Sequence, residues 1–425
     1  MPIRTYFSLL CLLLFNGMVI AQQNNEVTLS SALQLATRDN PNLAQLRARS
    51  EAMASIAPQV AALPDPVISF SALNLPTDTF NLGQENMTQL QGGISQAIPF
   101  PGKLALREQT AQHEAEAAAH NVVEARWQLM REVKQQWWNL FYLDRALAII
   151  SANQNLLRQF IKIASTKYEV GEGLQQDVLL AQLELSKMLE NELSLSGARR
   201  NTAARLNALL NLPANHPLRL PKQTEENLPS LQTEDALYTT AEQRRALLSA
   251  QQQRIKAAES RLQLAERDYY PDFNIGAYYG GREDMPNGQE RADFLSFRLS
   301  MNVPLFAADK QGRAVDQRSS ELMQQKYALR DEWNRTRAQI SQAYNDFQRA
   351  KQQAQLFKTG IIPQARQTVS SMLAGYQVNK VDFLNLVRSQ VTLFNYETQY
   401  WKTLAEAHQA LAQLTASVGK EEIYE

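Results

Sequence analysis

Two short segments of this chain repeat one pattern, and this repeat constrains the fold more than any other feature. Tyr168–Gln182 and Tyr376–Gln390 both begin with Tyr-x-Val and both end in glutamine, and their first residues are 208 positions apart. A pattern that recurs at such a distance indicates one supersecondary unit built twice. Further matching pairs, at an offset of 206, are Trp127 with Trp333, Asn139 with Asn345, and Phe141 with Phe347.

The segment before the first of these patterns predicts one very long helix. From Leu104 to about Tyr168 there is no proline, and apolar residues recur at heptad-like spacing. At 1.5 Å per residue this helix would be roughly 90–100 Å long, which favours a coiled-coil or helical-barrel element over a globular core. The expected apolar stripe is Val123, Trp127, Met130, Trp137 and Phe141.

Other helices are predicted around it. A return helix is expected over about 174–212, and the second half repeats the order with a helix over about 236–268. Its long helix should begin near Ala307 and be disturbed near Gly360 and Pro363, because proline breaks the helical hydrogen bonding.

Four segments are predicted to be β-strands, at about 67–75, 87–98, 273–281 and 294–303. In the last of them, apolar residues from Leu295 to Val303 alternate with Ser296, Arg298, Ser300 and Asn302. Such alternation gives one apolar face and one polar face. Tilted strands of this length can cross a bilayer. Four strands cannot close a barrel, however, so several chains would have to share one barrel. Two soluble hairpins packed on the helices are the alternative interpretation.

The chain divides into two repeats behind a targeting segment. Residues 1–21 are predicted to be a secretory signal peptide, with Arg4 before the apolar run and the small residue Ala21 at its end. Its Cys11 is the only cysteine, so no disulfide or thiolate chemistry is expected in the mature chain. The first repeat is assigned to 22–212 and the second to 236–425. Between them, 213–235 is a proline-rich connector expected to lie outside the core.

Composition and motifs argue against several functions. Lys plus Arg and Asp plus Glu number 43 each, so the net charge is zero and the chain has no overall positive potential that would attract nucleic acid. His113 and His120 share a helix face but lack a third ligand, so no metal site is predicted. There is no phosphate loop or nucleophile elbow. We therefore expect no enzyme and no cofactor.

The order helix, hairpin, long helix, turn, helix occurs twice, with two Tyr-x-Val tips and the junction Ile98-Pro-Phe-Pro-Gly-Lys103. This arrangement resembles the TolC family of outer-membrane efflux ducts over essentially the whole mature chain. The resemblance implies a mainly α protomer with a small β part and long coiled-coil helices, three copies of which form a 12-stranded β-barrel and an α-helical barrel. It also implies the Gram-negative outer membrane and its lipid as the environment, with the helices extending into the periplasm.

The resemblance further implies that the two tips form a periplasmic gate and docking site. In the family, a Tyr-x-x-Gly-(five residues)-Asp pattern places an aspartate in an acidic ring at the aperture, and Asp177 has that position here. The second copy departs from the pattern: Asn385 replaces the aspartate and Asn379 the glycine, with Arg388 nearby. A ring displaced to Asp382, or a mixed ring with Arg388 paired to Asp382 or Asp177, are both open. The predicted gate and docking residues are Tyr168, Gly171, Asp177, Tyr376, Asn379, Asp382, Asn385 and Arg388.

The function implied by the resemblance is that of a passive exit duct in a tripartite efflux system. Its partners would be a periplasmic adaptor protein and an inner-membrane pump of the RND type. The stretch Gln96–Lys103 resembles ducts of the CusC and CzcC kind more than multidrug or protein-export ducts, which would make heavy-metal cations the cargo. A type I secretion duct and a secreted coiled-coil scaffold without a channel are the alternatives.

Overall fold

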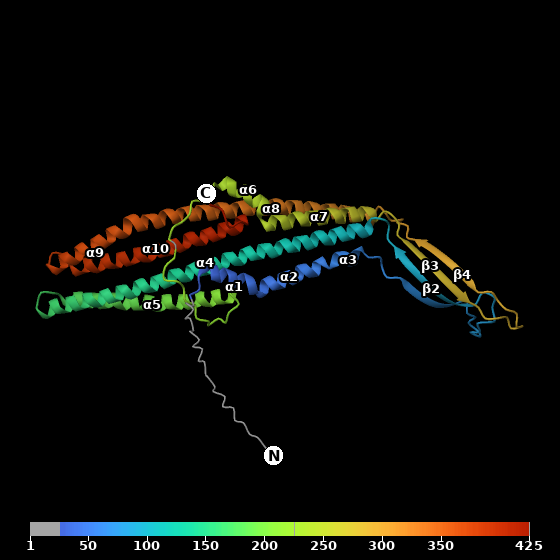
Figure 1. Cartoon of the computed structure of the whole chain (residues 1–425), viewed down its shortest axis with the longest axis horizontal. Helices are drawn as coiled ribbons and strands as arrows, with labels where there is room; N and C mark the ends of the chain where they lie inside the picture. Colours follow the sequence, from blue (N-terminus) through green and yellow to red (C-terminus); the bar gives the residue numbers. More distant parts are fainter. Residues whose placement is uncertain (1–25, 225, 425) are drawn as a thin grey trace, which may run out of the picture.

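The computed structural model describes residues 26–224 and 226–424, so the predicted signal peptide lies outside the described residues. These residues form a long, narrow molecule with a β-sheet at one end and the tips of two helical hairpins at the other (Figure 1). Within these ranges, no helix combines the length and apolar content that a membrane crossing requires. The chain is mainly helical with one small sheet, as the sequence predicts.

The first repeat begins with three short helices and continues with a hairpin and two long helices. Thr28 caps the first helix by accepting from the Ser31 N–H, and Asn40 caps the next, with Pro41 at its first position. The elements are α1 (Leu29–Asp39), α2 (Pro41–Ala54), α3 (Ile56–Ala61), β1 (Val67–Leu73), β2 (Gln89–Ile98), α4 (Lys103–Glu169) and α5 (Gln175–Leu209).

The second repeat has the same order with two departures from the predicted helices. Its elements are α6 (Glu234–Arg244), α7 (Ala246–Arg267), β3 (Phe273–Gly281), β4 (Phe294–Met301), α8 (Gln311–Leu356), the π-helical turn η1 (Phe357–Ile361), α9 (Ile362–Gln377) and α10 (Phe383–Val418). The long helix begins at Gln311 and not near Ala307, because turns occupy the intervening residues. The predicted disturbance near Gly360 and Pro363 is confirmed as the π-helical turn, a wider turn that accommodates a proline.

The helix predicted over 236–268 is broken at Arg245, which has an extended backbone (ψ 114°) between α6 and α7. The Arg245 side chain is buried, donates to the Ser417 carbonyl at 2.7 Å and lies 3.4 Å from the Glu124 carboxylate. A buried guanidinium requires such partners. The break therefore positions a charged side chain in the interior, which helical periodicity does not reveal.

The four strands form one antiparallel sheet in the order β1-β2-β3-β4, so β1 and β4 are its edges. β3 has the predicted bounds, whereas β1, β2 and β4 are each two residues shorter than predicted. The register brings large apolar side chains onto one face and small or polar ones, such as Ser69, Gly93 and Ser296, onto the other. The exposed large residues of the apolar face are Ile68, Phe70, Leu90, Ile94, Ile275, Tyr279, Leu295, Phe297, Leu299 and Met301.

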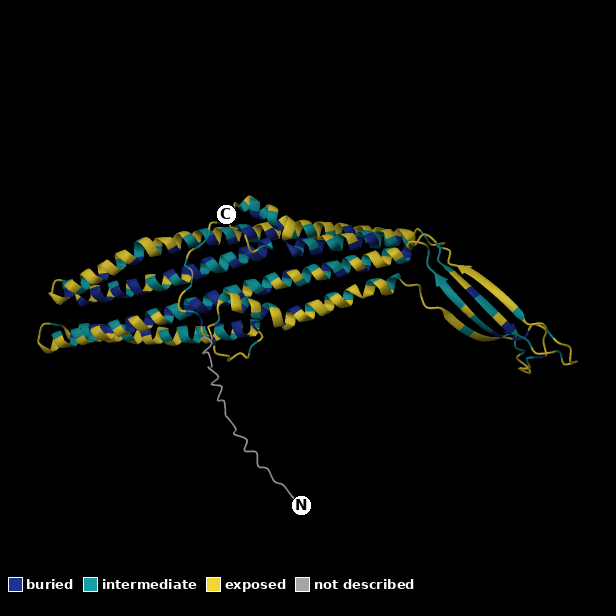
Figure 2. Cartoon of the chain, viewed as in Figure 1, coloured by how far each residue is buried: buried dark blue, intermediate teal, exposed yellow. Residues whose placement is uncertain are grey.

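Buried residues extend along the helical part from its middle toward the tips (Figure 2), and α4 packs on α1, α2, α5, α7 and α10. The predicted apolar stripe on α4 is only half right: Trp137 and Phe141 are buried, but Val123 is exposed. The buried face instead includes Leu129, Val133, Trp137 and Leu140. The connector also departs from expectation, since its apolar residues Leu218, Leu220 and Leu231 are buried in two of the core clusters.

Candidate functional site at the helix tips

The two Tyr-x-Val segments form turns of the same geometry at the end of the molecule away from the sheet (Figure 1). In the first turn, the Gly171 N–H donates to the Tyr168 carbonyl at 3.0 Å. In the second, the Asn379 N–H donates to the Tyr376 carbonyl at 3.2 Å. Gly171 (φ 78°) and Asn379 (φ 59°) both have the left-handed backbone conformation. Asparagine is among the few residues that tolerate this region, so the substitution of glycine by Asn379 preserves the turn.

The tyrosines that open the two patterns have different surroundings. Tyr376 is only 5% exposed, and its ring centroid lies 5.1 Å from that of Phe383. Burial, with a smaller contribution from the charge of Asp177, raises the pKa of Tyr376. Tyr168 is 48% exposed. The second tyrosine is therefore enclosed between the hairpins of one chain, whereas the first faces outward.

Lys167 joins the two tips, and the sequence alone did not single it out. Its ammonium group donates to the carbonyls of Tyr376 (3.2 Å) and Gln377 (3.4 Å) and to the side-chain oxygen of Asn379. It also lies 5.0 Å from the centroid of the Tyr376 ring. A cation at the carboxyl end of α9 satisfies the carbonyls that end the helix and complements its dipole.

A sequence difference between the two copies could have pointed to Lys167. The residue that matches it in the second copy is Gly375, where an added Cβ would lie 2.6 Å from the Val381 side chain. The second copy therefore has no space for a side chain at that position, and the first copy has a lysine there.

The two aspartates that the sequence proposed for the gate come from opposite tips and are close enough to interact. Asp177 lies in the first turn of α5, and Asp382 is the N-cap residue of α10. Burial raises the pKa of Asp177 and the charge of Asp382 raises it further, while a backbone hydrogen bond at Leu174 acts in the opposite direction. Because the pKa of Asp177 is raised, its protonated form stabilises the contact between the two tips at low pH. That stabilisation is lost as the pH rises through the pKa of Asp177.

Asn385 and Arg388 follow on the first turns of α10. The Asn385 N–H donates to the Asp382 carbonyl at 3.1 Å, and the equivalent bond in the first copy joins Asp177 to Leu174, also at 3.1 Å. Arg388 is exposed, and in residues 26–224 and 226–424 it forms no ion pair with Asp177 or Asp382. One chain thus brings together Lys167, Tyr376, Asn379 and the two aspartates, but not Arg388.

Chemically, this arrangement can hold two hairpins together or release them. The lysine contacts attract the tips, and the two carboxylates oppose that attraction. Among the described residues there is no group of three histidine, cysteine, aspartate or glutamate side chains placed to hold a metal ion. His113 instead contacts the Gln253 side-chain oxygen at 3.1 Å.

Comparison with known proteins decides the family. The family model described as "Outer membrane efflux protein" matches residues 32–212 and 237–420, so both repeats are included. The chain belongs to the outer membrane efflux protein family. It is accordingly an outer-membrane efflux protein with a TolC-like protomer fold, and it is not an enzyme.

Individual relatives are distant but match over nearly the full length. The cobalt-zinc-cadmium resistance protein CzcC of Cupriavidus metallidurans is 20% identical over 396 residues, which cover 93% of this chain and 90% of that protein. The structure of CusC has a TM-score of 0.77 at 14% identity and covers 93% of this chain and 92% of that one. The outer membrane protein VceC of Vibrio cholerae has a TM-score of 0.77 at 16% identity, with 93% and 97% covered.

Proposed function

We propose that three copies of this chain assemble into a passive exit duct that crosses the outer membrane and extends into the periplasm. The observation that carries this proposal is the sheet, whose apolar face is exposed and whose edge strands β1 and β4 each pair on one side only in the described part of the chain. Phe297 on that face is 78% exposed. In a bilayer, lipid can cover such a face, but each strand edge needs a partner. Three four-stranded sheets joined edge to edge would close a 12-stranded barrel with its polar face inside.

The internal duplication supports a specific seam between copies. Within one chain, the Lys103 ammonium lies 2.9 Å from the Asp272 carboxylate, which also accepts from the Phe100 N–H at 2.7 Å. Lys103 begins α4, and Asp272 precedes β3. The matching aspartate of the other repeat is Asp65, before β1, and the lysine that directly precedes its long helix α8 is Lys310.

The second half of this junction makes no such ion pair among residues 26–224 and 226–424. Asp65 and Lys310 are exposed, and they belong to the two opposite edges of the sheet. Leu305, which matches Phe100, is 81% exposed. When β4 of one copy pairs with β1 of the next, Lys310 and Leu305 approach Asp65 of that neighbouring copy. The same contacts that join the two repeats would then join the copies.

The tips supply the gate in this proposal. Lys167 holds the two hairpins of one chain together, while Asp177 and Asp382 weaken that contact. Behind these groups, an apolar cluster that includes Phe160 and Phe383 also joins the two hairpins, so opening is expected to begin at the exposed end of the tips. A periplasmic adaptor protein that binds at the tips, and with it an inner-membrane pump of the RND type, would open the duct by competing for these groups.

Heavy-metal cations are the proposed cargo. The support is the similarity to CzcC, whose name specifies cobalt, zinc and cadmium. A duct does not select its cargo by fold, so the pump sets the choice. A type I secretion duct is the alternative, and identification of the pump bound to the tips separates the two.

The test is the conductance of the purified protein in planar lipid bilayers. We expect discrete channel openings and fractionation with outer membranes. A secreted coiled-coil scaffold would give soluble protein without conductance, and that result would refute the duct.

A further inference from the structure

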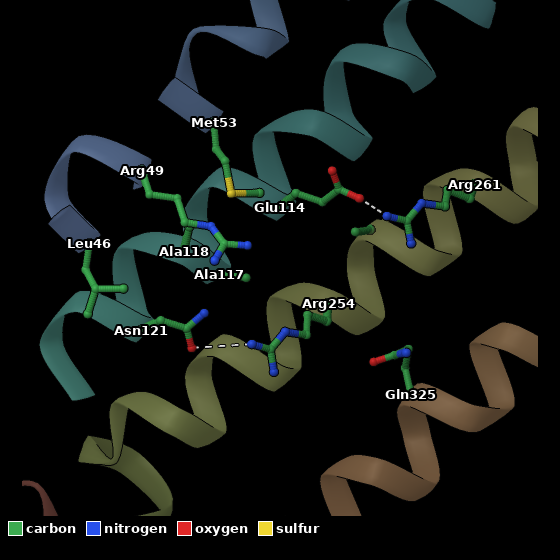
Figure 3. A pocket seen from close by; sticks show the side chains of 11 residues that line it. Leu46, Arg49, Met53, Glu114, Ala117, Ala118, Asn121, Arg254, Arg261 and Gln325 are labelled. Carbon is green, nitrogen blue, oxygen red and sulfur yellow. Dashed lines mark hydrogen bonds and ion pairs between the residues drawn. The ribbon is translucent and has the colours of Figure 1, made fainter. Parts of the chain in front are cut away.

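A recess on the helical wall carries an inference beyond the duct. It has a volume of about 530 Å³ and lies over α2, α4 and α7, with one residue from α8 (Figure 3). All of these helices belong to one chain. Its lining residues are Leu46, Arg49, Met53, Glu114, Ala117, Ala118, Asn121, Arg254, Ala257, Arg261 and Gln325.

The recess exists because small residues occupy its centre. Ala117 and Ala118 on α4, with Ala257 on α7, leave room where longer side chains would fill the groove between the helices. Leu46 and Met53 of α2 add apolar surface along one side (Figure 3). The interior is therefore partly apolar, and its volume is in the range of small-molecule sites.

Three arginines surround this apolar centre, and only one has a carboxylate partner in the recess. Arg261 pairs with Glu114. Arg254 donates to neutral groups only, the side-chain oxygens of Asn121 at 3.3 Å and Gln251 at 3.0 Å.

The guanidinium group of Arg49 makes no hydrogen bond or ion pair within residues 26–224 and 226–424. In Figure 3 its guanidinium group extends over Ala117 and Ala118, toward the side on which Arg254 lies. With three guanidinium groups against one carboxylate, the recess has an excess of positive charge.

We propose that this recess binds an organic anion, a phosphate or carboxylate group attached to an apolar body. Guanidinium groups bind these planar or tetrahedral oxyanions through paired hydrogen bonds, and Arg49 and Arg254 have donors to offer. The apolar part of the ligand lies on the alanine floor, against Leu46 and Met53. Such a ligand connects α2, α4 and α7 across the helical wall.

The probe for this site is 1-naphthyl phosphate, titrated by ligand-observed NMR into the purified full-length mature protein in a nonionic detergent. Empty micelles serve as the blank, and neutral 1-naphthol reports binding that does not need the anion. We expect saturable binding of the phosphate, weakened about tenfold by Arg49→Gln and by Arg254→Gln, since each removes a charge-assisted contact. Added salt should weaken it as well.

The matched control is Arg47→Gln, because Arg47 is an exposed arginine on α2 that does not line the recess. This variant should bind like the wild-type protein. The proposal is overturned if the phosphate does not saturate, if naphthol binds equally well, or if all three variants weaken binding to the same extent. None of these outcomes affects the conductance test of the duct.

Discussion

Replacement of Lys103 by methionine is expected to lower the free energy of unfolding by about 2–3 kcal/mol. The Lys103 side chain is 2% exposed, and its ammonium lies 2.9 Å from Asp272, 3.1 Å from Asp268 and 3.2 Å from the Tyr270 carbonyl. Breaking a fully buried ion pair costs about 3–5 kcal/mol, and the half-exposed carboxylates here reduce that figure. The change should appear as a lower melting temperature of the helices by circular dichroism.

Lys256→Met is the control for this variant, because Lys256 is exposed on α7 and forms no ion pair within the described residues. The loss of unfolding free energy in the Lys103 variant should also depend on pH. Burial alone would raise the pKa of Asp272, but hydrogen bonds from the Phe100 N–H and Lys103 outweigh it and lower the pKa. Stability from Asp272 is therefore present above the ordinary carboxylate pKa and is lost as the pH falls through the lowered value. Equal melting of the two lysine variants at neutral pH would disprove the role of Lys103.

Replacement of Lys167 by methionine is expected to increase the resting conductance of the duct about tenfold. The variant loses the bonds to the carbonyls of Tyr376 and Gln377 and to Asn379, and keeps a comparable apolar stem. Hydrogen bonds of a partly exposed charged group contribute about 1–2 kcal/mol, and 1.4 kcal/mol corresponds to a tenfold change in the population of separated tips. Bilayer recordings without adaptor or pump measure this directly.

Lys162→Met is the matched control, since Lys162 is an exposed lysine on the same helix near the tip. It should leave the resting conductance unchanged. In the wild-type protein, the resting conductance should fall in acid, because protonation of Asp177 removes its repulsion of Asp382. If the Lys167 and Lys162 variants conduct equally, the tip contact does not hold the duct closed.

The sequence predicted those parts of the fold that depend on neighbouring residues. The four strands and the two tips were located correctly, because alternation of apolar and polar residues, and turn residues, can be recognised within about ten residues. The sequence did not reveal that Leu218, Leu220 and Leu231 are buried, since prolines nearby indicate only the absence of regular structure. Nor did it reveal Arg245, whose buried position depends on Ser417 and Glu124, far away in the chain.

The candidate site was predicted in the same uneven way. Gly171 and Asp177 follow from the motif, and Asn379 and Asp382 were singled out by the departures of its second copy. Lys167 depends on a contact with residues more than 200 positions away. A pairing of Arg388 with Asp382 or Asp177 was one of two alternatives that the sequence left open. Within residues 26–224 and 226–424 Arg388 forms no ion pair, and a pairing across copies stays a prediction. Long-range contacts of this kind need the packing of the two hairpins and cannot be derived from one segment.

In the proposed assembly, three copies close one duct along the seam between Asp65 of one copy and Lys310 of the next. The predicted mature chain has no cysteine, so the variant Asp65→Cys/Lys310→Cys contains only the two introduced thiols. After treatment with a short bismaleimide, denaturing gels should show covalent dimers and trimers and nothing larger, because a closed ring of three has no free seam. The single variant Asp65→Cys should remain monomeric on the same gel. A double variant that stays monomeric, or that continues into species larger than trimers, would rule out a closed ring of three copies.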